Sequence, residues 1–441
     1  MFPCEVKTEI CVFTFRVLTL LLYLCRMNKL VIKNVGPIRS IDIPLNKINV
    51  FIGPQSSGKS TIAKIVSFCS WLEKDVERTE SVAMHGVLAE LEAFHRMEGF
   101  FNDDSSILYI GDNVVFAYNV DEPLDLSGRF EVCNASYYNE KELLLYTIEK
   151  TVAPKVCYIP AERSFVSAMP NAKKYADRED NLLSFIEDWL ESKRHYPTAK
   201  AMELINLGIK YYYNEKMDRD MLVLENGEKV SLTNASSGMQ SLVPLLVLLN
   251  WCANGIYEEK KPYSPEEMMN IKKLLAEVSK NSGSQDEQKK QLLERMNDIM
   301  EGRVYTHTQF IIEEPEQNLF PKTQVDFLYF LLAMVNHGRK HRLVLTTHSP
   351  YVLYALNNCL LAHLVEKNMD EDAKEGVDAV KYAINPKHVS VWQIENGHLV
   401  NEKGDRDATI QDENGLIRKN YFNNIMRQVM GEFNELLNYY E

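Results

Sequence analysis

A glycine-rich segment followed by a lysine and a serine has the pattern most specific for chemistry in this sequence. The segment that fits G-x-x-x-x-G-K-[ST] at every position is Gly53-Pro54-Gln55-Ser56-Ser57-Gly58-Lys59-Ser60. In this pattern the glycines let backbone N–H groups point at phosphates, the lysine reaches the β/γ oxygens, and the serine hydroxyl binds Mg²⁺. The apolar run before it and the helical run from Thr61 supply the strand and helix that such a loop needs. The segment predicts a nucleotide-binding site, and Thr61, the next residue, is predicted to belong to that site.

Two consecutive carboxylates form the second candidate for chemistry. Glu313 and Glu314 follow the apolar run 309–312. Adjacent strand residues point to opposite faces, so the two side chains can have different roles. One would hold Mg²⁺, directly or through water, and the other would polarise water for attack on a γ-phosphate. Taken alone, the pair would read as an acidic loop after a buried strand, and the phosphate loop in the same chain makes the functional interpretation the better one.

Two further polar elements lie at the ends of apolar runs. His348 follows RLVLTT and is placed to hydrogen-bond a γ-phosphate, although a lone histidine in a loop is usually structural. Asn234-Ala235-Ser236-Ser237-Gly238-Met239-Gln240 precedes a long apolar helix near 237–254. A serine at a helix start caps free N–H groups, and that helix end favours an anion. The element predicts either a capped buried helix, offset at Pro244, or a second phosphate contact made across a dimer.

The elements that must position these residues alternate between strand-like and helix-like patterns. Strands are expected over 29–35 and 46–52, at 309–312 and 342–347, and near 389–397. Residues 75–150 are mixed, residues 160–230 are predicted as a mainly helical insertion with a hairpin turn at Asn226-Gly227, and residues 255–302 as a helical hairpin insertion. The pattern predicts an α/β class: a core sheet flanked by helices, with a β-rich N-terminal part, in one domain over 27–441.

Composition narrows the class of protein. The chain has 441 residues and a formal net charge of −13, with 45% hydrophobic and 25% charged residues. This composition is typical of globular proteins. The excess of acidic residues disfavours binding to nucleic acid or anionic lipid over the whole surface. The eight scattered cysteines have no metal-like spacing and predict reduced thiols in a cytoplasmic protein.

The N-terminal segment needs its own interpretation. Residues 10–24 are apolar apart from Arg16 and two threonines, which is too short for a spanning helix, and no signal-peptide cleavage site follows. We expect residues 1–26 to be a non-native extension ahead of a natural start at Met27. A membrane-associating helix is the alternative, and no membrane role is expected for the rest of the chain.

Four motifs occur in the order GPQSSGKS, NASSGMQS, FIIEEPEQNLFP and VLTTHSPYVL. Together they resemble the ABC-type ATPases, in particular the RecF/SMC-like branch of AAA family proteins that includes the overcoming-lysogenization-defect (OLD) ATPases. The resemblance covers residues 27 to about 441. It implies a P-loop NTPase fold with an ABC-like core, ATP and Mg²⁺ as cofactors, and hydrolysis of ATP to ADP and phosphate.

Residue roles follow from the same resemblance. Lys59 and Ser60 correspond to the Walker A lysine and magnesium serine, and Glu313 stands where most ABC proteins have the Walker B aspartate. Glu314 corresponds to the catalytic carboxylate and His348 to the switch histidine.

The signature loop is matched by Ser236, Ser237, Gly238 and Gln240, although it begins Asn-Ala-Ser-Ser-Gly rather than Leu-Ser-Gly-Gly. No Q-loop glutamine can be assigned. Glu162 and Arg163, in a "PAER" element, are expected either to link nucleotide state to partner contacts or to form an ordinary Arg–Glu pair on the surface.

The resemblance also implies partners. Two subunits would form a homodimer, or a higher even oligomer, around two ATP molecules. OLD proteins add a Toprim nuclease, but the acids Asp405, Asp407, Asp412 and Glu413 are interpreted as a solvated loop. The chain therefore resembles the ATPase part of two-gene anti-phage modules (Septu, PARIS, retron-associated), whose separate effector is a nuclease or toxin. The alternatives are a RecF-like DNA-maintenance ATPase, weakly supported by basic residues at 173–178 and 191–196, and a scaffold that binds nucleotide with little turnover.

Overall fold

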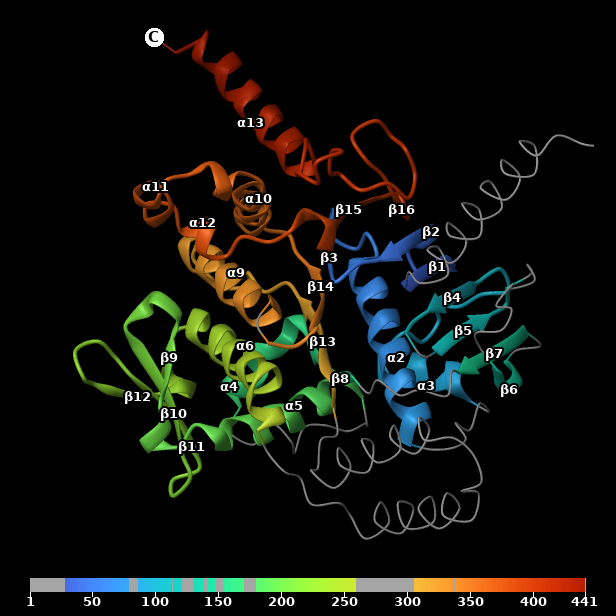
Figure 1. Cartoon of the computed structure of the whole chain (residues 1–441), viewed down its shortest axis with the longest axis horizontal. Coiled ribbons are helices and arrows are strands. Elements are labelled where there is room, and N and C mark those ends of the chain that lie inside the picture. The colour runs from blue at the N-terminus through green and yellow to red at the C-terminus, as the bar shows by residue number, and fades with distance from the viewer. Residues whose placement is uncertain are drawn as a thin grey trace, which may run out of the picture. The chain divides into compact units, whose positions relative to one another are not determined.

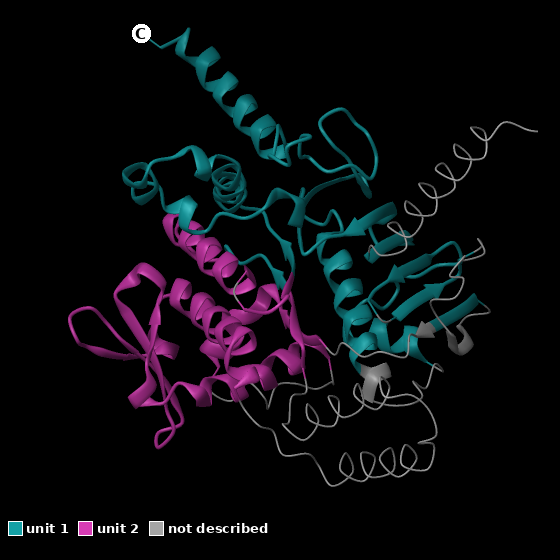
Figure 2. Cartoon of the chain, viewed as in Figure 1, with its two compact units in different colours: residues 1–151, 311–316, 343–441 teal, residues 152–310, 317–342 magenta. Residues whose placement is uncertain are grey.

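The computed structural model describes residues 28–78, 86–112, 114–120, 131–138, 141–147, 154–169, 180–258, 305–336 and 338–440. The chain divides into two compact units (Figure 2). Unit 1 comprises residues 1–151, 311–316 and 343–441, and unit 2 comprises residues 152–310 and 317–342. The predictions for residues 1–26, for the helical hairpin within 255–302 and for the basic run 173–178 lie outside the described residues, apart from 255–258 at the start of the hairpin range.

The centre of unit 1 is a group of parallel strands. β3 (Ile48–Ile52) lies between β14 (Arg342–Thr346) and β15 (Val389–Glu395), with Ile48 opposite Leu343 on one side and Val389 on the other. All five residues of β3 are buried. A parallel strand covered on both faces needs a continuous apolar run, and INVFI provides one.

The N-terminal part of unit 1 extends this sheet with antiparallel strands. The order from the edge is β6-β7-β5-β4-β1-β2-β16-β15-β3-β14-β13. The strands not yet delimited are β1 (Asn28–Val35), β2 (Ile38–Leu45), β4 (Ser106–Ile110), β5 (Val114–Tyr118), β6 (Glu131–Tyr138), β7 (Lys141–Thr147), β13 (His307–Glu313) and β16 (His398–Leu399). The predicted α/β class, with a core sheet flanked by helices and a β-rich N-terminal part, is confirmed, and the sheet is mixed.

The helices of unit 1 lie between and after its strands along the chain, α2 directly after β3 and α10 directly after β14 (Figure 1). They are α2 (Lys59–Arg78), α3 (Val87–Phe94), α10 (Pro350–Val365), α11 (Glu371–Glu375), α12 (Asp378–Lys381) and α13 (Tyr421–Leu437). α2 buries Ile62, Ile65 and Cys69 at spacings of three and four residues, so its apolar stripe faces the core of the unit. α13 differs from the others because none of its residues is buried.

Unit 2 is built around α6 (Ser237–Ala253), a helix that is apolar on nearly all sides. Such a helix must be covered all round, and 12 of its residues are buried. It contacts α4 (Phe165–Ala168), α5 (Asn181–Ser192), α9 (Pro321–Asn336) and β8 (Pro154–Ile159). Among the described residues, Ser237–Tyr257 is the one helical stretch long and apolar enough to span a membrane. Of its most apolar window, 67% is buried inside the protein, as in the core helix of a globular protein.

A small antiparallel sheet corrects the helical prediction for the later part of residues 160–230, whose earlier part does contain helices α4 and α5. Its strands are β9 (Met202–Leu204), β10 (Ile209–Asn214), β11 (Arg219–Val223) and β12 (Lys229–Ser231). The polar run 178–215, rich in Tyr and Lys, suggested a helix, but Tyr211-Tyr212-Tyr213 favours a strand, because aromatic side chains pack well against cross-strand neighbours. The hairpin at Asn226-Gly227 is confirmed, with Leu222 opposite Val230.

Candidate functional site

The phosphate-loop segment connects β3 to α2 and has a backbone that requires glycine at two positions. Gly53 and Gly58 have φ angles of 149° and 107°. A Cβ on Gly58 would lie 2.3 Å from Ile38 Cδ1, and one on Gly53 would lie 2.7 Å from the Ile394 carbonyl oxygen. Neighbouring strands of unit 1 therefore hold the loop closely, and a side chain at either glycine would displace it.

Lys59 is the first residue of α2 and is only 5% exposed. Its ammonium group donates to the carbonyl oxygens of Gly53 (3.0 Å) and Pro54 (2.7 Å). Burial lowers the pKa of Lys59, and the negative charges of Glu314, Glu316 and Glu313 oppose that shift. A cation is thus held inside the loop, facing the strand end that carries the carboxylates.

The hydroxyl of Ser60 and the carboxylate of Glu313 meet, although 253 positions separate them in sequence. Ser60 Oγ donates to Glu313 Oε2 at 2.9 Å. One hydroxyl and one carboxylate fit Mg²⁺, which takes few protein ligands and completes its shell with water and substrate phosphate. Within the described residues no group of three or more His, Cys, Asp or Glu side chains forms an all-protein metal cage.

Glu314 turns away from its neighbour and faces His348. Its backbone is left-handed, with φ of 44°, and its N–H donates to the Thr346 carbonyl at 2.9 Å. Its Oε1 lies 3.3 Å from His348 Nε2. A non-glycine residue in this conformation is uncommon and is maintained here by the surrounding strands, a feature often found where side chains must be aimed.

Glu316 is a third carboxylate whose role the sequence reasoning missed. Its two oxygens accept from Thr347 Oγ1 (2.8 Å) and from the His348 N–H (2.5 Å). Burial raises the pKa of Glu316, and the hydrogen bonds from the His348 and Glu316 N–H groups and from Thr347 oppose the rise. Glu316 fixes the backbone that carries His348. The available signal was the spacing E-E-P-E, in which the proline separates this acid from the pair.

The Ser-Gly element forms the start of α6 in unit 2. Ser236 is the N-cap, and its Oγ accepts from the Met239 N–H at 3.4 Å. Ser236 and Ser237 are exposed, whereas the Gln240 amide donates back to the Thr233 carbonyl at 2.9 Å. A Cβ on Gly238 would lie 3.0 Å from the Asn318 carbonyl oxygen. The helix start therefore exposes two serine residues, and the Gln240 amide donates back into the element itself.

Pro244 lies inside α6 and frees a carbonyl that the structure uses. Because proline has no N–H, the carbonyl of Gln240 lacks its usual helical donor. Ser167 Oγ donates to that oxygen at 2.8 Å, and Arg163 Nε donates to the next carbonyl, that of Ser241, at 3.2 Å. Arg163 is fully buried. Arg163 of η1 (Ala161–Ser164) and Ser167 of α4 thus support α6 from within unit 2.

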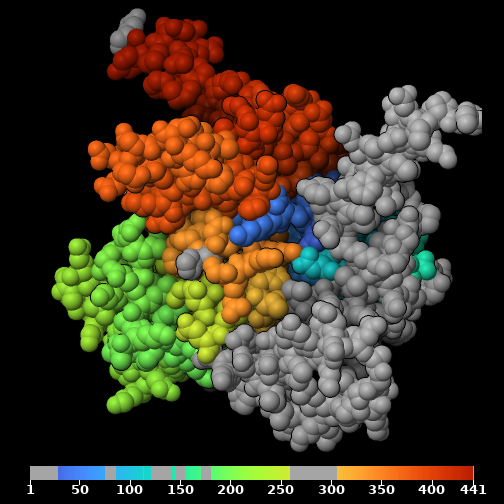
Figure 3. All heavy atoms as spheres, in the orientation of Figure 1, coloured from blue at the N-terminus to red at the C-terminus, as the bar shows by residue number. Residues whose placement is uncertain are grey.

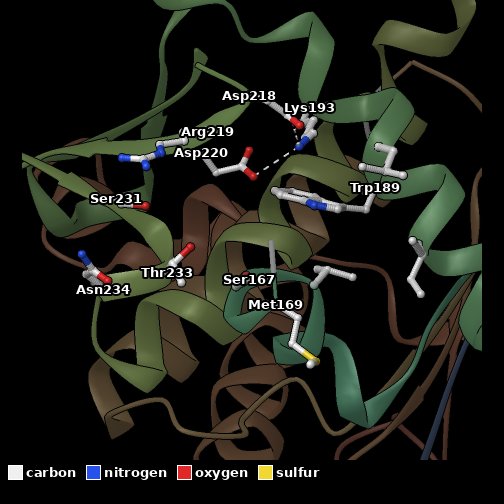
Figure 4. Close-up of a pocket in the computed structure, with 13 residues that line it drawn as sticks. Ser167, Met169, Trp189, Lys193, Asp218, Arg219, Asp220, Ser231, Thr233 and Asn234 are labelled. Carbon is white, nitrogen blue, oxygen red and sulfur yellow. Dashed lines mark hydrogen bonds and ion pairs between the residues drawn. The ribbon is translucent and has the colours of Figure 1, made fainter. Parts of the chain in front are cut away.

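A cavity of about 280 Å³ adjoins the Ser-Gly element (Figure 4). Ser167, Thr233 and Asn234 line it on one side, with Trp189 and Lys193 among the other lining residues. Lys193 Nζ lies 3.4 Å from Asp220 Oδ2 and 4.3 Å from the centre of the Tyr213 ring. The lysine of the basic run 191–196 is therefore paired within unit 2.

The structure groups the predicted residues by unit. Unit 1 brings together the phosphate loop, Glu313, Glu314 and His348, and unit 2 holds the element from Asn234 to Gln240. Asp412 pairs with Arg418 and accepts from the Leu416 N–H within its own loop. Cys69, Cys157, Cys252 and Cys359 are buried and free.

Comparisons with known proteins give structural likenesses at low identity. The search of solved structures matched an SMC head domain from Thermotoga maritima at 12% identity and a TM-score of 0.33, covering 75% of this chain and 92% of that one. It also matched an ATP-binding cassette in a dimeric post-hydrolysis state bound to ADP and Pi, at 9% identity and a TM-score of 0.29, covering 86% and 99%. No protein-family model matched, and no curated protein matched.

Proposed function

We propose that this chain is an ATP-binding and ATP-hydrolysing enzyme of the ABC type. The observation that carries the proposal is the pair of contacts behind the phosphate loop, Ser60 to Glu313 and Glu314 to His348. A buried lysine, a hydroxyl–carboxylate pair and a second, separately oriented carboxylate are the parts that phosphoryl transfer from a nucleotide requires.

Each residue has a defined task in this proposal. The loop N–H groups and Lys59 bind the β- and γ-phosphates, so Lys59 exchanges its loop carbonyls for phosphate oxygens. Ser60 and Glu313 hold Mg²⁺, which neutralises charge on the phosphate oxygens when bound. Glu314 accepts a proton from the attacking water, and His348 orients Glu314 and donates toward the γ-phosphate.

The Ser-Gly element supports a two-subunit arrangement. Ser236 and Ser237 are exposed at the start of a buried helix whose N-terminus favours an anion. In the proposed sandwich, this element of one subunit contacts the ATP held by the partner subunit. ATP binding closes the dimer, and hydrolysis through Glu314 reopens it.

The proposed wider role is to gate a separate effector protein, a nuclease or toxin, in bacterial anti-phage defence. This step rests on the resemblance of the four motifs. The RecF-like alternative has less support, because Lys193 in its basic run 191–196 is already paired with Asp220 and the chain carries a net charge of −13.

The decisive test is light scattering after size exclusion on the full chain carrying Glu314→Gln, with and without ATP and Mg²⁺. We expect ATP to double the mass, because the closed state forms and hydrolysis cannot reopen it. Gly238→Asp in the same background should abolish the doubling by placing a charge at the phosphate contact. Gly238→Ala is the matched control, because it adds a Cβ close to the Asn318 carbonyl without adding a charge.

Two outcomes would contradict different parts of the proposal. A mass that does not respond to ATP, in a protein that still binds ATP in equilibrium dialysis, would remove the sandwich mechanism. Glu228→Gln makes the same chemical change on the surface and serves as the control for folding. If neither folded variant binds ATP at all, the ATPase assignment itself is removed.

A further inference from the structure

The C-terminal helix α13 is a 17-residue helix with no buried residue. Seven large apolar side chains are each at least 43% exposed, namely Ile425, Met426, Val429, Met430, Phe433, Leu436 and Leu437. In Figures 1 and 3 this helix, coloured red, extends away from the rest of unit 1. A contiguous apolar surface of this kind marks an interaction site, because single exposed apolar residues are ordinary and a continuous stripe is not.

The apolar residues form a single stripe along the helix. Met426, Val429, Phe433 and Leu436 recur at spacings of three and four, which places them on one face. Ile425, Met430 and Leu437 flank this line, and the opposite face is polar, with Asn424, Arg427, Gln428, Gly431 and Glu435. The pattern is that of a helix that packs one face against a partner.

Within the described part of unit 1, the hydrogen bonds that hold α13 all lie at its first turn. Asn420 and Asn423 form a capping box, the Tyr421 N–H donates to Gln393 Oε1 at 2.7 Å, and the Asn423 amide donates to Tyr354 Oη at 3.0 Å. An isolated helix of this length is marginal in water, so its later turns need tertiary or quaternary packing.

We infer that the apolar face of α13 packs against α13 of a second copy of this chain, in antiparallel orientation. Charge supports a second copy as the occupant. The whole chain carries −13, whereas α13 carries one Arg (Arg427) and two Glu (Glu432 and Glu435), a net −1, so two copies meet here with little repulsion. An anionic membrane would require a lysine- or arginine-rich polar face, and α13 has a single arginine.

The antiparallel orientation follows from the attachment of each helix to unit 1 at its N-terminal end. In a parallel pair, two strongly acidic bodies would emerge side by side. In an antiparallel pair they emerge at opposite ends of a helix of about 26 Å, beyond the screening length in physiological salt. Around the two-fold axis Met426 then faces Leu436, and Val429 faces Phe433, as alternating core layers require.

The size of this contact predicts a measurable but moderate affinity. Two such stripes would bury on the order of 1,000 Å² in total, at the lower limit of stable interfaces. The contact needs no nucleotide. It is separate from the proposed ATP sandwich, and the two together would give an even oligomer larger than a dimer.

The test is sedimentation velocity on the full chain in nucleotide-free buffer, between about 1 and 50 µM, the range suited to the micromolar affinity of a small interface. Wild-type protein should shift from monomer to dimer over this range, and Val429→Glu with Phe433→Glu should stay monomeric. These residues are exposed, so the variant keeps its fold, which circular dichroism checks. Asn424→Glu with Gln428→Glu adds the same charge to the polar face and should leave the dimer intact.

Other outcomes overturn the inference. Wild-type protein that is monomeric at the highest concentration excludes the second copy, and binding to lipid vesicles that is lost in Val429→Glu with Phe433→Glu would assign the stripe to a membrane. Orientation is tested by oxidative cross-linking above the wild-type background. Met426→Cys with Leu436→Cys should cross-link, and a cross-link by Met426→Cys alone would overturn the antiparallel arrangement.

Discussion

The carboxylate cluster of unit 1 and the Ser-Gly element of unit 2 are held in place by different physics. Glu313, Glu314 and Glu316 each contact a polar partner, and the negative charge of these acids raises the pKa of Lys59 against the effect of burial. The Ser-Gly element is neutral and is supported from behind through the carbonyls of Gln240 and Ser241. Changes in the first region should therefore affect chemistry, and changes in the second should affect stability and assembly.

The largest expected effect is that of Glu314→Gln on turnover. Removing the proton acceptor should lower kcat by about 10²–10⁴-fold, the range for a general base, and leave ATP affinity nearly unchanged. Phosphate release measured beside a filter-binding assay separates the two quantities. If kcat stays within about threefold of wild type, Glu314 is not the base.

Arg163→Met is the corresponding change in unit 2 and should act on stability. It removes a buried donor to the Ser241 carbonyl, which should cost about 1–3 kcal/mol of unfolding free energy. Urea denaturation measures this cost. ATP-driven doubling of mass should weaken, whereas ATP binding by the phosphate loop should persist. Loss of ATP binding in a folded variant would contradict the separation between the two regions.

Glu316→Gln tests whether a residue that only positions His348, and takes no part in the chemical step, affects turnover. The amide cannot accept from both Thr347 and the His348 N–H, so His348 should shift and kcat should fall by about tenfold. Thr347→Val removes one of these donors and should have a smaller effect of the same kind. A loss as large as that of Glu314→Gln would mean that Glu316 takes part in the proton transfer.

The smallest effect is expected for Ser167→Ala. It leaves the Gln240 carbonyl, which Pro244 has already deprived of its helical donor, without the Ser167 hydroxyl. The cost should be about 1 kcal/mol of stability, read from urea denaturation, with kcat unchanged. A combined variant with Pro244→Ala restores a helical N–H and should recover part of that loss; no recovery would refute the assigned role of Ser167.

Prediction from sequence succeeded for secondary structure where the determining interactions are local. The strand and helix that flank Gly53–Ser60, and the hairpin at Asn226-Gly227, depend on glycine conformations and on the residues next to them. The prediction was wrong for the segment around Tyr211, which forms strand β10 and not a helix. Its structure depends on pairing with β9 and β11, which the polar composition of the segment does not reveal.

The sequence by itself determined which residues are available for chemistry: a lysine and serine after the glycines, two acids at a strand end, and serines at a helix start. Only the tertiary structure decided which of them meet. Ser60 reaches Glu313 across 253 positions because β13 and β3 lie in one sheet. Glu316 holds the His348 backbone because the segment after β14 folds back against it.

The amphipathic pattern of α13 is visible in the sequence, but only the structure shows that no described part of the chain covers it. Periodicity reports which face is apolar, whereas burial depends on what the rest of the chain brings to it.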